Sequence, residues 1–485
     1  MPLPTIPSGN VASALPSGYE VANSCRFEDG DSPYMHKTPS SAGNRRTVTF
    51  SSWVKRGNFT NGFYFSGGTA VNNYTQIGFS SNRINFYDII GGSNQVNLTT
   101  TAVFRDPSAW YHVVVAVDTT QSTNTNRVKF YINGTLYDGA FDSSTYPDQN
   151  DDLYFGQAEI MAVGALHYTA GTIDFFDGYL AEAVYIDGTQ YAASDFGEFD
   201  EDSPTIWKPK DVSGLTFGTN GFYLDFEDSS NLGNDANGGT DLTEVNLAAS
   251  DQTPDTPTNN FATLNPLGFA GTTPTFSQGN LNALCGSGVS LYSVPTIGVS
   301  SGKWYVEGEL EQATPSSGVY YVDYGFHDRA DTRGQSYYVS NGRMFWLSSW
   351  DGKINYRTGG STTAGLVTGL ATLTPGDFFQ LYLDMDNELM YWGKNGSLLN
   401  STGVSFNGKE SLTGEYFFAF ADQYSGSTTE YAVNFGQGSI DGSAVANFQD
   451  ANGFGNFKYN PTVTTDEGSK DFLALCTKNL GSNGG

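Results

Sequence analysis

The stretch from Asp377 to Ser397 (DFFQLYLDMDNELMYWGKNGS) constrains the fold more than any other part of the chain. Apolar and polar side chains alternate from Phe379 to Asp386, and this period of two is typical of a strand that is buried on one face. Asp386-Asn387 tolerates left-handed backbone angles, and Asn395-Gly396 favours a type I′ hairpin turn. The stretch therefore predicts two antiparallel strands, followed by a second reversal of the chain.

The first half of the chain shows the same pattern repeatedly. Seven short runs follow one another, each bounded by Gly, Asn, Asp or Ser: TVTFSSWVKRG, NGFYFSGG, YTQIGFSS, RINFYDII, WYHVVVAVD, RVKFYINGTLYDGAF and FFDGYLAEAVYIDG. The run from Trp110 to Asp118 is apolar on both faces, so we expect it inside a sheet, paired with Val128, Phe130 and Ile132. Strands of this length and spacing predict a β-sandwich.

The second half, from Phe261 onward, carries a similar set of alternating runs and no convincing helical period. We therefore predict an all-β protein with two antiparallel β-sandwich domains in tandem. The expected organisation is an N-terminal arm over 1–40, a sandwich over 41–200, an acidic connector with one or two strands over 201–260, and a second sandwich with a C-terminal extension over 261–485. The run NGFYLDFED is the strand expected within the connector.

The charge of the chain limits its partners. Lys and Arg number 23 against 51 Asp and Glu, which gives a net charge of −28. Such a surface disfavours binding to nucleic acid or to an anionic membrane. From the N-terminal residues we expect no signal peptide, and from the lack of ~18 consecutive apolar residues we expect no membrane helix. Cys25, Cys285 and Cys476 fit neither a disulfide framework nor a zinc site, so we expect three reduced core residues.

Two family resemblances rest on longer motifs. SGKWYVEGEL at Ser301, LDMDNELMYWGKNG at Leu383 and AVNFGQGS at Ala432 resemble a SPRY domain. The flanking segments NNFATLNPL at Asn259 and FLALCTKNL at Phe472 resemble the borders of SPRY modules in bacteriophage tail-fibre proteins. The first half resembles the laminin-G/concanavalin A-like domains of phage structural proteins, through motifs that begin at Ser24 (SCRFEDGDSPYMHKTPSSAGNRRTVTFSSWVKRG), Trp110 (WYHVVVAVD) and Tyr179 (YLAEAVYIDG).

These resemblances imply two concanavalin A-like/SPRY-like jelly-roll domains in a phage virion protein, made in the bacterial host cytoplasm and located on the particle surface. A tail fibre or head appendage that adheres to host-surface glycans is the expected function. A capsid decoration protein without a receptor role is the alternative, and a glycan depolymerase is a third possibility. The implied partners are other virion proteins and a host glycan or receptor, and we expect a homo-oligomer, with a trimer favoured.

Aromatic loops of the second half are the predicted ligand-binding site. Aromatic faces stack on sugar rings, and a neighbouring carboxylate accepts hydrogen bonds from sugar hydroxyls. Alternate members of an aromatic-rich region also serve simply as core. The candidates are Tyr320, Tyr321, Tyr337, Trp350 and Asp351, and Trp350, in a turn, is the one we most expect to be exposed.

Two groups of carboxylates are candidates for a catalytic site and for a calcium site. Glu307, Glu309 and Glu311 share one face of a predicted strand, an arrangement that glycanases use for a nucleophile and an acid. The middle residue departs from the usual pattern, and a solvated strand face is the alternative that we adopt, so we expect no catalytic residues and no enzyme. Asp225, Glu227 and Asp228 are calcium candidates, with a solvated acidic loop as the alternative, and we expect no cofactor beyond this structural ion.

Overall fold

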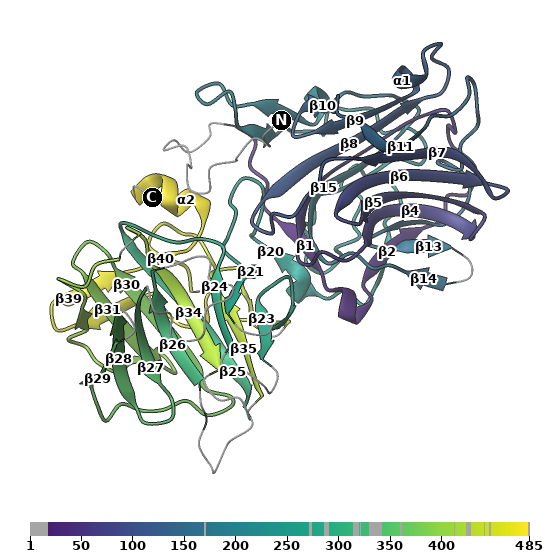
Figure 1. The fold of residues 1–485 in the computed structure, drawn as a ribbon. Coiled ribbons are helices and arrows are strands. Elements are labelled where there is room, and N and C mark those ends of the chain that lie inside the picture. Colours follow the sequence, from purple (N-terminus) through teal and green to yellow (C-terminus); the bar gives the residue numbers. More distant parts are fainter. Residues whose placement is uncertain are drawn as a thin grey trace. The chain divides into compact units, whose positions relative to one another are not determined.

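The computed structural model describes residues 18–168, 171–270, 274–285, 291–313, 320, 322–328, 342–358, 361–411, 413–422, 428–440, 442–445 and 448–483. The chain divides into two compact units, Pro16–Thr258 and a second that contains Asn259–Gly485 (Figure 1). Both are built from antiparallel sheets, which confirms the predicted all-β fold class. The described helices are short: α1 (Asn124–Arg127), α2 (Thr477–Asn483), and the 3₁₀ turns η1 (Asp29–Asp31), η2 (Ala193–Asp195) and η3 (Ala249–Asp251).

The first unit is a sandwich of two eight-stranded sheets. Sheet 1 contains, in spatial order, β10 (Thr135–Leu136), β9 (Val128–Ile132), β8 (Trp110–Asp118), β3 (Thr47–Arg56), β15 (Gly178–Asp187), β1 (Ser24–Phe27) and β20 (Gln252–Thr253), with β18 (Phe222–Leu224) paired to β15. Sheet 2 contains β11 (Phe141–Thr145), β7 (Ser93–Thr100), β6 (Arg83–Ile90), β5 (Asn73–Ser80), β4 (Gly62–Ala70), β12 (Met161–Val163), β2 (Tyr34–Lys37) and β19 (Thr243–Val245). Two small hairpins, β13 (Leu166–Tyr168) with β14 (Gly171–Ile173) and β16 (Gly197–Phe199) with β17 (Trp207–Pro209), complete it.

The interior of this sandwich follows from strand alternation. Phe50, Ile77, Phe86, Leu98 and Val115 all lie in one buried cluster between the sheets. Strand β8 lies between β3 and β9, which confirms the interior position and the partner predicted from its apolar faces.

The structure differs from the predicted arm and connector. Within 1–40, β1 joins sheet 1 and β2 joins sheet 2. The 201–260 segment holds four strands rather than one or two, because β17, β18, β19 and β20 all lie in it, and three of them complete the sheets. The predicted strand NGFYLDFED corresponds to β18. Short edge strands of this kind are specified by the strand they pair with, and their own sequences carry little alternation.

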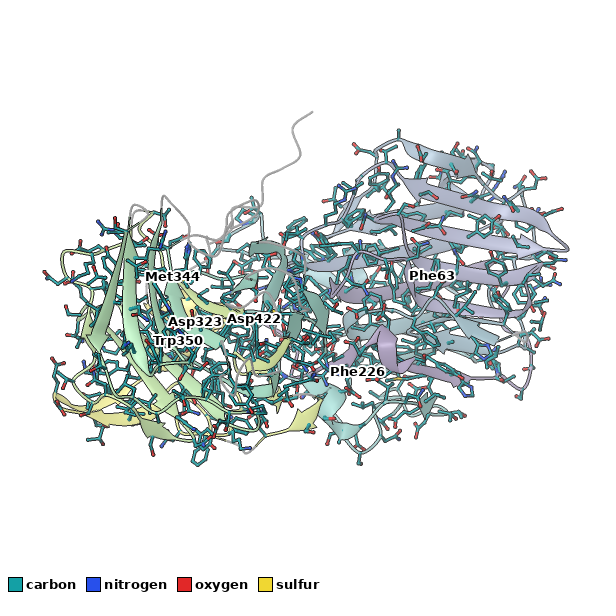
Figure 2. The ribbon with its side chains drawn as sticks, turned by 60° about the horizontal axis from the view of Figure 1, so that its bottom comes forward. Phe63, Phe226, Asp323, Met344, Trp350 and Asp422 are labelled. Carbon is teal, nitrogen blue, oxygen red and sulfur yellow. The ribbon has the colours of Figure 1, made fainter. Side chains whose placement is uncertain are left out.

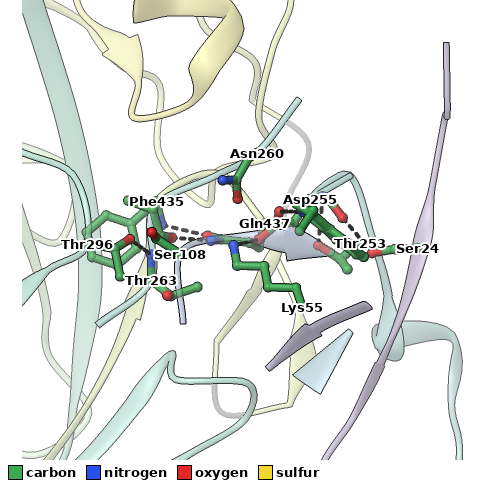
Figure 3. A network of polar contacts seen from close by, with 12 residues as sticks. Ser24, Lys55, Ser108, Thr253, Asp255, Asn260, Thr263, Thr296, Phe435 and Gln437 are labelled. Atoms are coloured by element: carbon green, nitrogen blue, oxygen red, sulfur yellow. Dashed lines mark hydrogen bonds and ion pairs between the residues drawn. The ribbon is translucent and has the colours of Figure 1, made fainter. Parts of the chain in front are cut away.

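A buried ion pair holds the end of that segment in place (Figure 3). The Lys55 Nζ on β3 lies 2.7 Å from a carboxylate oxygen of Asp255, and neither side chain is exposed to solvent. The other oxygen of this carboxylate accepts a hydrogen bond from the Trp110 indole at 3.2 Å, and the Asp255 carbonyl accepts one from the Ser24 hydroxyl at 2.6 Å. Residues 252–258 are thus part of the first sandwich.

The second unit is also a sandwich. Sheet 3 contains β21 (Leu264–Ala270), β24 (Leu291–Pro295), β34 (Phe417–Asp422), β26 (Val322–His327), β27 (Arg343–Ser348), β28 (Lys353–Thr358) and β29 (Ser361–Val367). Sheet 4 contains β22 (Thr275–Ser277), β23 (Asn282–Cys285), β35 (Thr429–Asn434), β25 (Lys303–Ala313), β30 (Phe378–Asp384), β31 (Leu389–Lys394) and β32 (Ser397–Leu398), with β33 (Val404–Ser405) paired to β31 and β40 (Leu473–Ala474) paired to β25. Two further hairpins are β36 (Ser439–Ile440) with β37 (Ser443–Ala444) and β38 (Thr462–Thr465) with β39 (Gly468–Asp471).

The hairpin predicted from Asp377–Ser397 is present as β30, β31 and β32. Asn395 and Gly396 both have positive φ, as a type I′ turn requires. Two details differ from the prediction. The left-handed residue of the first turn is Glu388, and β30 is buried on both faces, because the C-terminal residues Phe457 and Phe472 cover its Tyr382 face.

Two further expectations concern the cysteines and the membrane. Cys25, Cys285 and Cys476 are all free and buried, as the sequence predicted. Among the helices of the described ranges, none has the length and apolarity needed to cross a bilayer.

Candidate functional site

Trp350 projects from the tight turn that joins β27 to β28 (Figure 2). Its side chain is 46% exposed, which is unusual for the largest apolar residue, and confirms the exposure predicted from the sequence. Gly352, with φ +64, closes the turn, and a Cβ there would collide with the Leu370 carbonyl oxygen at 2.3 Å. Glycine thereby allows the reversal that presents Trp350 to solvent.

Polar groups stand beside this ring. The Asp351 carboxylate accepts a 2.7 Å ion-pair contact from Lys353, whose ammonium lies 5.7 Å from the centre of the Trp350 ring. The second Asp351 oxygen has no hydrogen-bond partner among the described residues. Tyr320, half-buried, is placed next to the turn because its carbonyl accepts a hydrogen bond from the Ser349 hydroxyl at 2.8 Å. The backbone of Tyr320 therefore lies beside the turn that holds Trp350 and Asp351.

Some of the other aromatic residues of this region are buried, and others lie in the part of the chain that the structure does not describe. Tyr324 and Trp346 are buried, so they serve as core, in keeping with the alternative considered for this region. Tyr321 and Tyr337 lie outside the described residues.

Glu307 occupies a closed environment. Its side chain is fully buried on β25, where its carboxylate accepts hydrogen bonds from the Asn434 amide, the Tyr305 hydroxyl and the backbone N–H groups of Lys458 and Tyr459, at 2.6 to 3.1 Å. Burial raises the pKa of this carboxyl. The contacts hold the C-terminal segment against sheet 4, a structural role that the sequence did not indicate.

The calcium candidates do not gather into one group. The Asp225 carboxylate accepts a hydrogen bond from the Glu227 N–H, and that of Asp228 accepts two from Ser230. These are local loop contacts, and they agree with the solvated acidic loop considered as the alternative.

A different acidic cluster is present at the rim of the first sandwich. Carboxylate oxygens of Glu28, Asp29 and Asp177 all lie within 4.8 Å of one another, the one such set of three in the described ranges. Burial, and then the charges of Glu28 and Asp29, raise the pKa of Asp177 well above its ordinary value. Three carboxylates fit a hard cation such as Ca²⁺ chemically, and the sequence reasoning missed them because 28–29 and 177 meet only in the fold.

Glu182 is another buried carboxylate of the first unit. It lies in a bulge of β15 with φ +51, a strained backbone angle for a non-glycine residue. The Tyr223 hydroxyl donates a hydrogen bond to its carboxylate at 2.8 Å, and the Tyr19 hydroxyl donates a longer one at 3.3 Å. Burial raises the pKa of Glu182 to about 8, although the two hydroxyls act in the opposite direction.

Three tyrosines that the sequence analysis did not single out also come together. Tyr74 on β5 lies between Tyr87 on β6 and Tyr168 on β13, with ring centres 5.9 and 6.0 Å apart. Each is half-buried. The alternation of tyrosine with core residues in YTQIGF and INFYDI was the available signal, but each strand contributes only one ring, so the group emerges from strand register.

Comparison with known proteins finds a family that is similar to part of the first sandwich. The Laminin_G_3 family, described as the concanavalin A-like lectin/glucanases superfamily, matches residues 29–185. No curated protein sequence matches the chain.

Three solved structures are among those that show similarity to this chain. The SPRY domain of human HERC1 is 18% identical, covering 35% of this chain and 96% of its own, with a TM-score of 0.27. The heptameric SAP-like pentraxin of Limulus polyphemus is 14% identical. The similarity covers 36% of this chain and 80% of the pentraxin chain, with a TM-score of 0.28. Domains LG4-5 of the mouse laminin alpha1 chain are 11% identical. The similarity covers 95% of this chain and 94% of the laminin chain, with a TM-score of 0.29. Residues 29–185 are thus similar in sequence to the concanavalin A-like lectin/glucanases superfamily.

Proposed function

We propose that this protein is a non-enzymatic phage virion protein, a tail fibre or head appendage, that adheres to glycans of the host surface. The observation that carries the adhesion is Trp350, an exposed indole in a turn where the largely buried Asp351 carboxylate holds the more exposed Lys353 ammonium. An indole face stacks on the apolar face of a sugar ring, and the flanking charged groups hydrogen-bond to hydroxyls.

Two observations support the class of ligand and the absence of catalysis. Residues 29–185 match a superfamily named for lectins and glucanases. The strand carboxylate that would have served a depolymerase, Glu307, has its oxygens occupied by four internal donors and is fully buried. The assignment to a virion rests on the motif resemblances of both halves.

The test is adhesion of the purified full chain to cells of the bacterium that the phage infects. We expect saturable binding that soluble surface polysaccharide inhibits, and about tenfold weaker binding for Trp350→Ala, because a stacking aromatic contributes on the order of 1 kcal/mol or more. Phe448→Ala is the matched control, since that residue is 45% exposed in the same unit.

Three results would count against the proposal. Wild-type protein that fails to bind cells would favour the capsid decoration role, and so would cell binding that Trp350→Ala leaves unchanged. Release of reducing sugar from host polysaccharide would contradict the non-enzymatic part.

A further inference from the structure

The outward face of sheet 2 lacks charge at its centre. Ile77, Phe86 and Leu98 point into the core, so their strand neighbours point outward. Strand register aligns these neighbours in two rows across five strands, and none of the side chains is ionisable to a charge at neutral pH. The rows are Phe63, Gly78, Asn85, Thr99 and Ser143, and Ser66, Gln76, Tyr87, Asn97 and Thr145. Phe63, Ser66, Gln76, Gly78 and Asn85 are buried, so the members that reach solvent are Tyr87, Asn97, Thr99, Ser143 and Thr145.

This composition is unexpected for this chain. Its net charge is −28, and Asp and Glu side chains are mostly exposed in folded proteins. Arg83 and Asp142, at the margin of the face, form an ion pair with each other. Amides, hydroxyls and tyrosines thus form the centre of the face.

Hydrogen bonds fix the amides in place. The Gln76 amide donates to the Asn85 side-chain oxygen at 3.0 Å, and the Asn85 amide donates to the Thr99 hydroxyl at 2.7 Å. The Tyr87 hydroxyl donates to Asn94 at 2.6 Å, which holds the ring at one orientation. Side chains fixed in this way lose little conformational entropy when a ligand binds.

Tyrosine rings border the amide rows. Tyr168, Tyr74 and Tyr87 form a continuous row with steps of 6.0 and 5.9 Å, and all three are half-buried, so part of each ring faces solvent. Burial, and then the neighbours Tyr87 and Tyr168, raise the pKa of Tyr74 to about 12, so its hydroxyl remains a donor at neutral pH.

From this juxtaposition we infer a second binding site, on the outward face of β5, β6 and β7 together with Tyr168, whose ligand is an uncharged oligosaccharide chain. The tyrosine row stacks on successive sugar rings, and Asn97 and Thr99 hydrogen-bond to their hydroxyls. An anionic glycan is disfavoured because the rows hold no Lys or Arg to pair with it.

This inference rests on the proposed function in one respect, that the protein binds glycans. It differs in the site and in the ligand, because the Trp350 turn carries charged groups whereas this face does not. The competing explanation is that the three tyrosines only stabilise the sheet as cross-strand neighbours.

The experiment is affinity electrophoresis of the full chain in gels that contain one soluble polysaccharide each. The neutral panel is amylose, mannan, galactan and xylan, and the anionic panel is alginate and hyaluronan. We expect retardation by at least one neutral polymer and by neither anionic polymer. For that neutral polymer, Tyr74→Ala and Tyr87→Ala should each weaken binding about tenfold, as should Asn97→Asp, which places a charge in the row.

Leu136→Ala is the control, because Leu136 is 47% exposed in the same unit but lies on sheet 1. Circular dichroism and thermal melting test whether each variant is folded. Tyr87→Phe keeps the aromatic ring, so this variant should retain most of the binding even if Tyr87→Ala unfolds. Absence of retardation by every neutral polymer, retardation unchanged in the tyrosine variants, or preference for the anionic polymers would overturn the inference.

The two proposals fail separately. Retardation that depends on Tyr87, combined with no adhesion to host cells, would support this site and contradict the proposed function. Cell adhesion that depends on Trp350, without binding to any neutral glycan, would support the proposed function and contradict the site on sheet 2.

Discussion

Glu182 makes the stability of the first sandwich depend on pH. Its pKa is about 8 in the folded protein against 4.5 for an ordinary glutamate, so its contribution to the free energy of unfolding is fully present below about pH 4.5 and declines as the pH rises to about 8. Glu182→Gln keeps an acceptor for Tyr223 and removes the titration. We expect the stability difference between the variant and wild type to grow in the variant's favour by on the order of 2–4 kcal/mol between pH 5 and pH 9. Denaturant unfolding at each pH measures it, and parallel curves would contradict the role of Glu182.

Single residues show where sequence reasoning succeeds. The exposure of Trp350 was predictable, because a Trp-Asp-Gly turn between strands leaves the side chain outside both sheets. The burial of Glu307 was not, since three carboxylates at alternate positions normally indicate a solvent face. Three of its four donors come from residues 434 and 458–459, far along the chain. A carboxylate's environment depends on elements that its own strand does not encode.

At the scale of elements, the Lys55–Asp255 pair fastens residues 252–258 to β3. Burial lowers the pKa of Lys55 and Asp255 opposes that shift, so the pair is stable only as a unit. Lys55→Met should cost about 3–5 kcal/mol, because it leaves a buried carboxylate without its counter-charge. The double variant Lys55→Met/Asp255→Asn should recover much of this loss while keeping an acceptor for Trp110.

The exposed ion pair of Arg46 and Asp152 provides the control, with an expected cost below about 1 kcal/mol for Arg46→Ala. Chemical denaturation of wild type, both single variants Lys55→Met and Asp255→Asn, and the double variant gives the coupling energy, and Arg46→Ala is measured beside them. Equal losses for Lys55→Met and Arg46→Ala would mean that the buried pair does not hold this segment.

Elements with strong alternation were predictable, and elements that depend on a partner strand were not. Runs such as WYHVVVAVD and DFFQLYLD appear as β8 and β30 because their apolar residues identify a buried face. Strand β7 (SNQVNLTT) was missed, since its outward positions are Asn, Gln and Thr, which are also common in loops. Those same outward side chains help to make the uncharged face of sheet 2, so the segment that sequence patterns describe least well contributes to an inferred site.

For the whole molecule, two quantities distinguish a fibre or appendage from a capsid decoration protein. They are the position of the protein on the particle and its copy number. Single binding sites for glycans are weak, and repeated sites on one assembly bind a surface far more tightly through effective concentration. A fibre or appendage that adheres should therefore be a homo-oligomer, and we expect a trimer by light scattering, with antibody labelling at the tail or at projections from the head. A decoration protein would instead label the capsid evenly, in copy numbers that follow capsid symmetry. Uniform labelling of the capsid would contradict the fibre or appendage assignment. It would not decide the glycan sites, which have their own tests, because lectin-like sandwiches can bind sugars wherever the particle carries them.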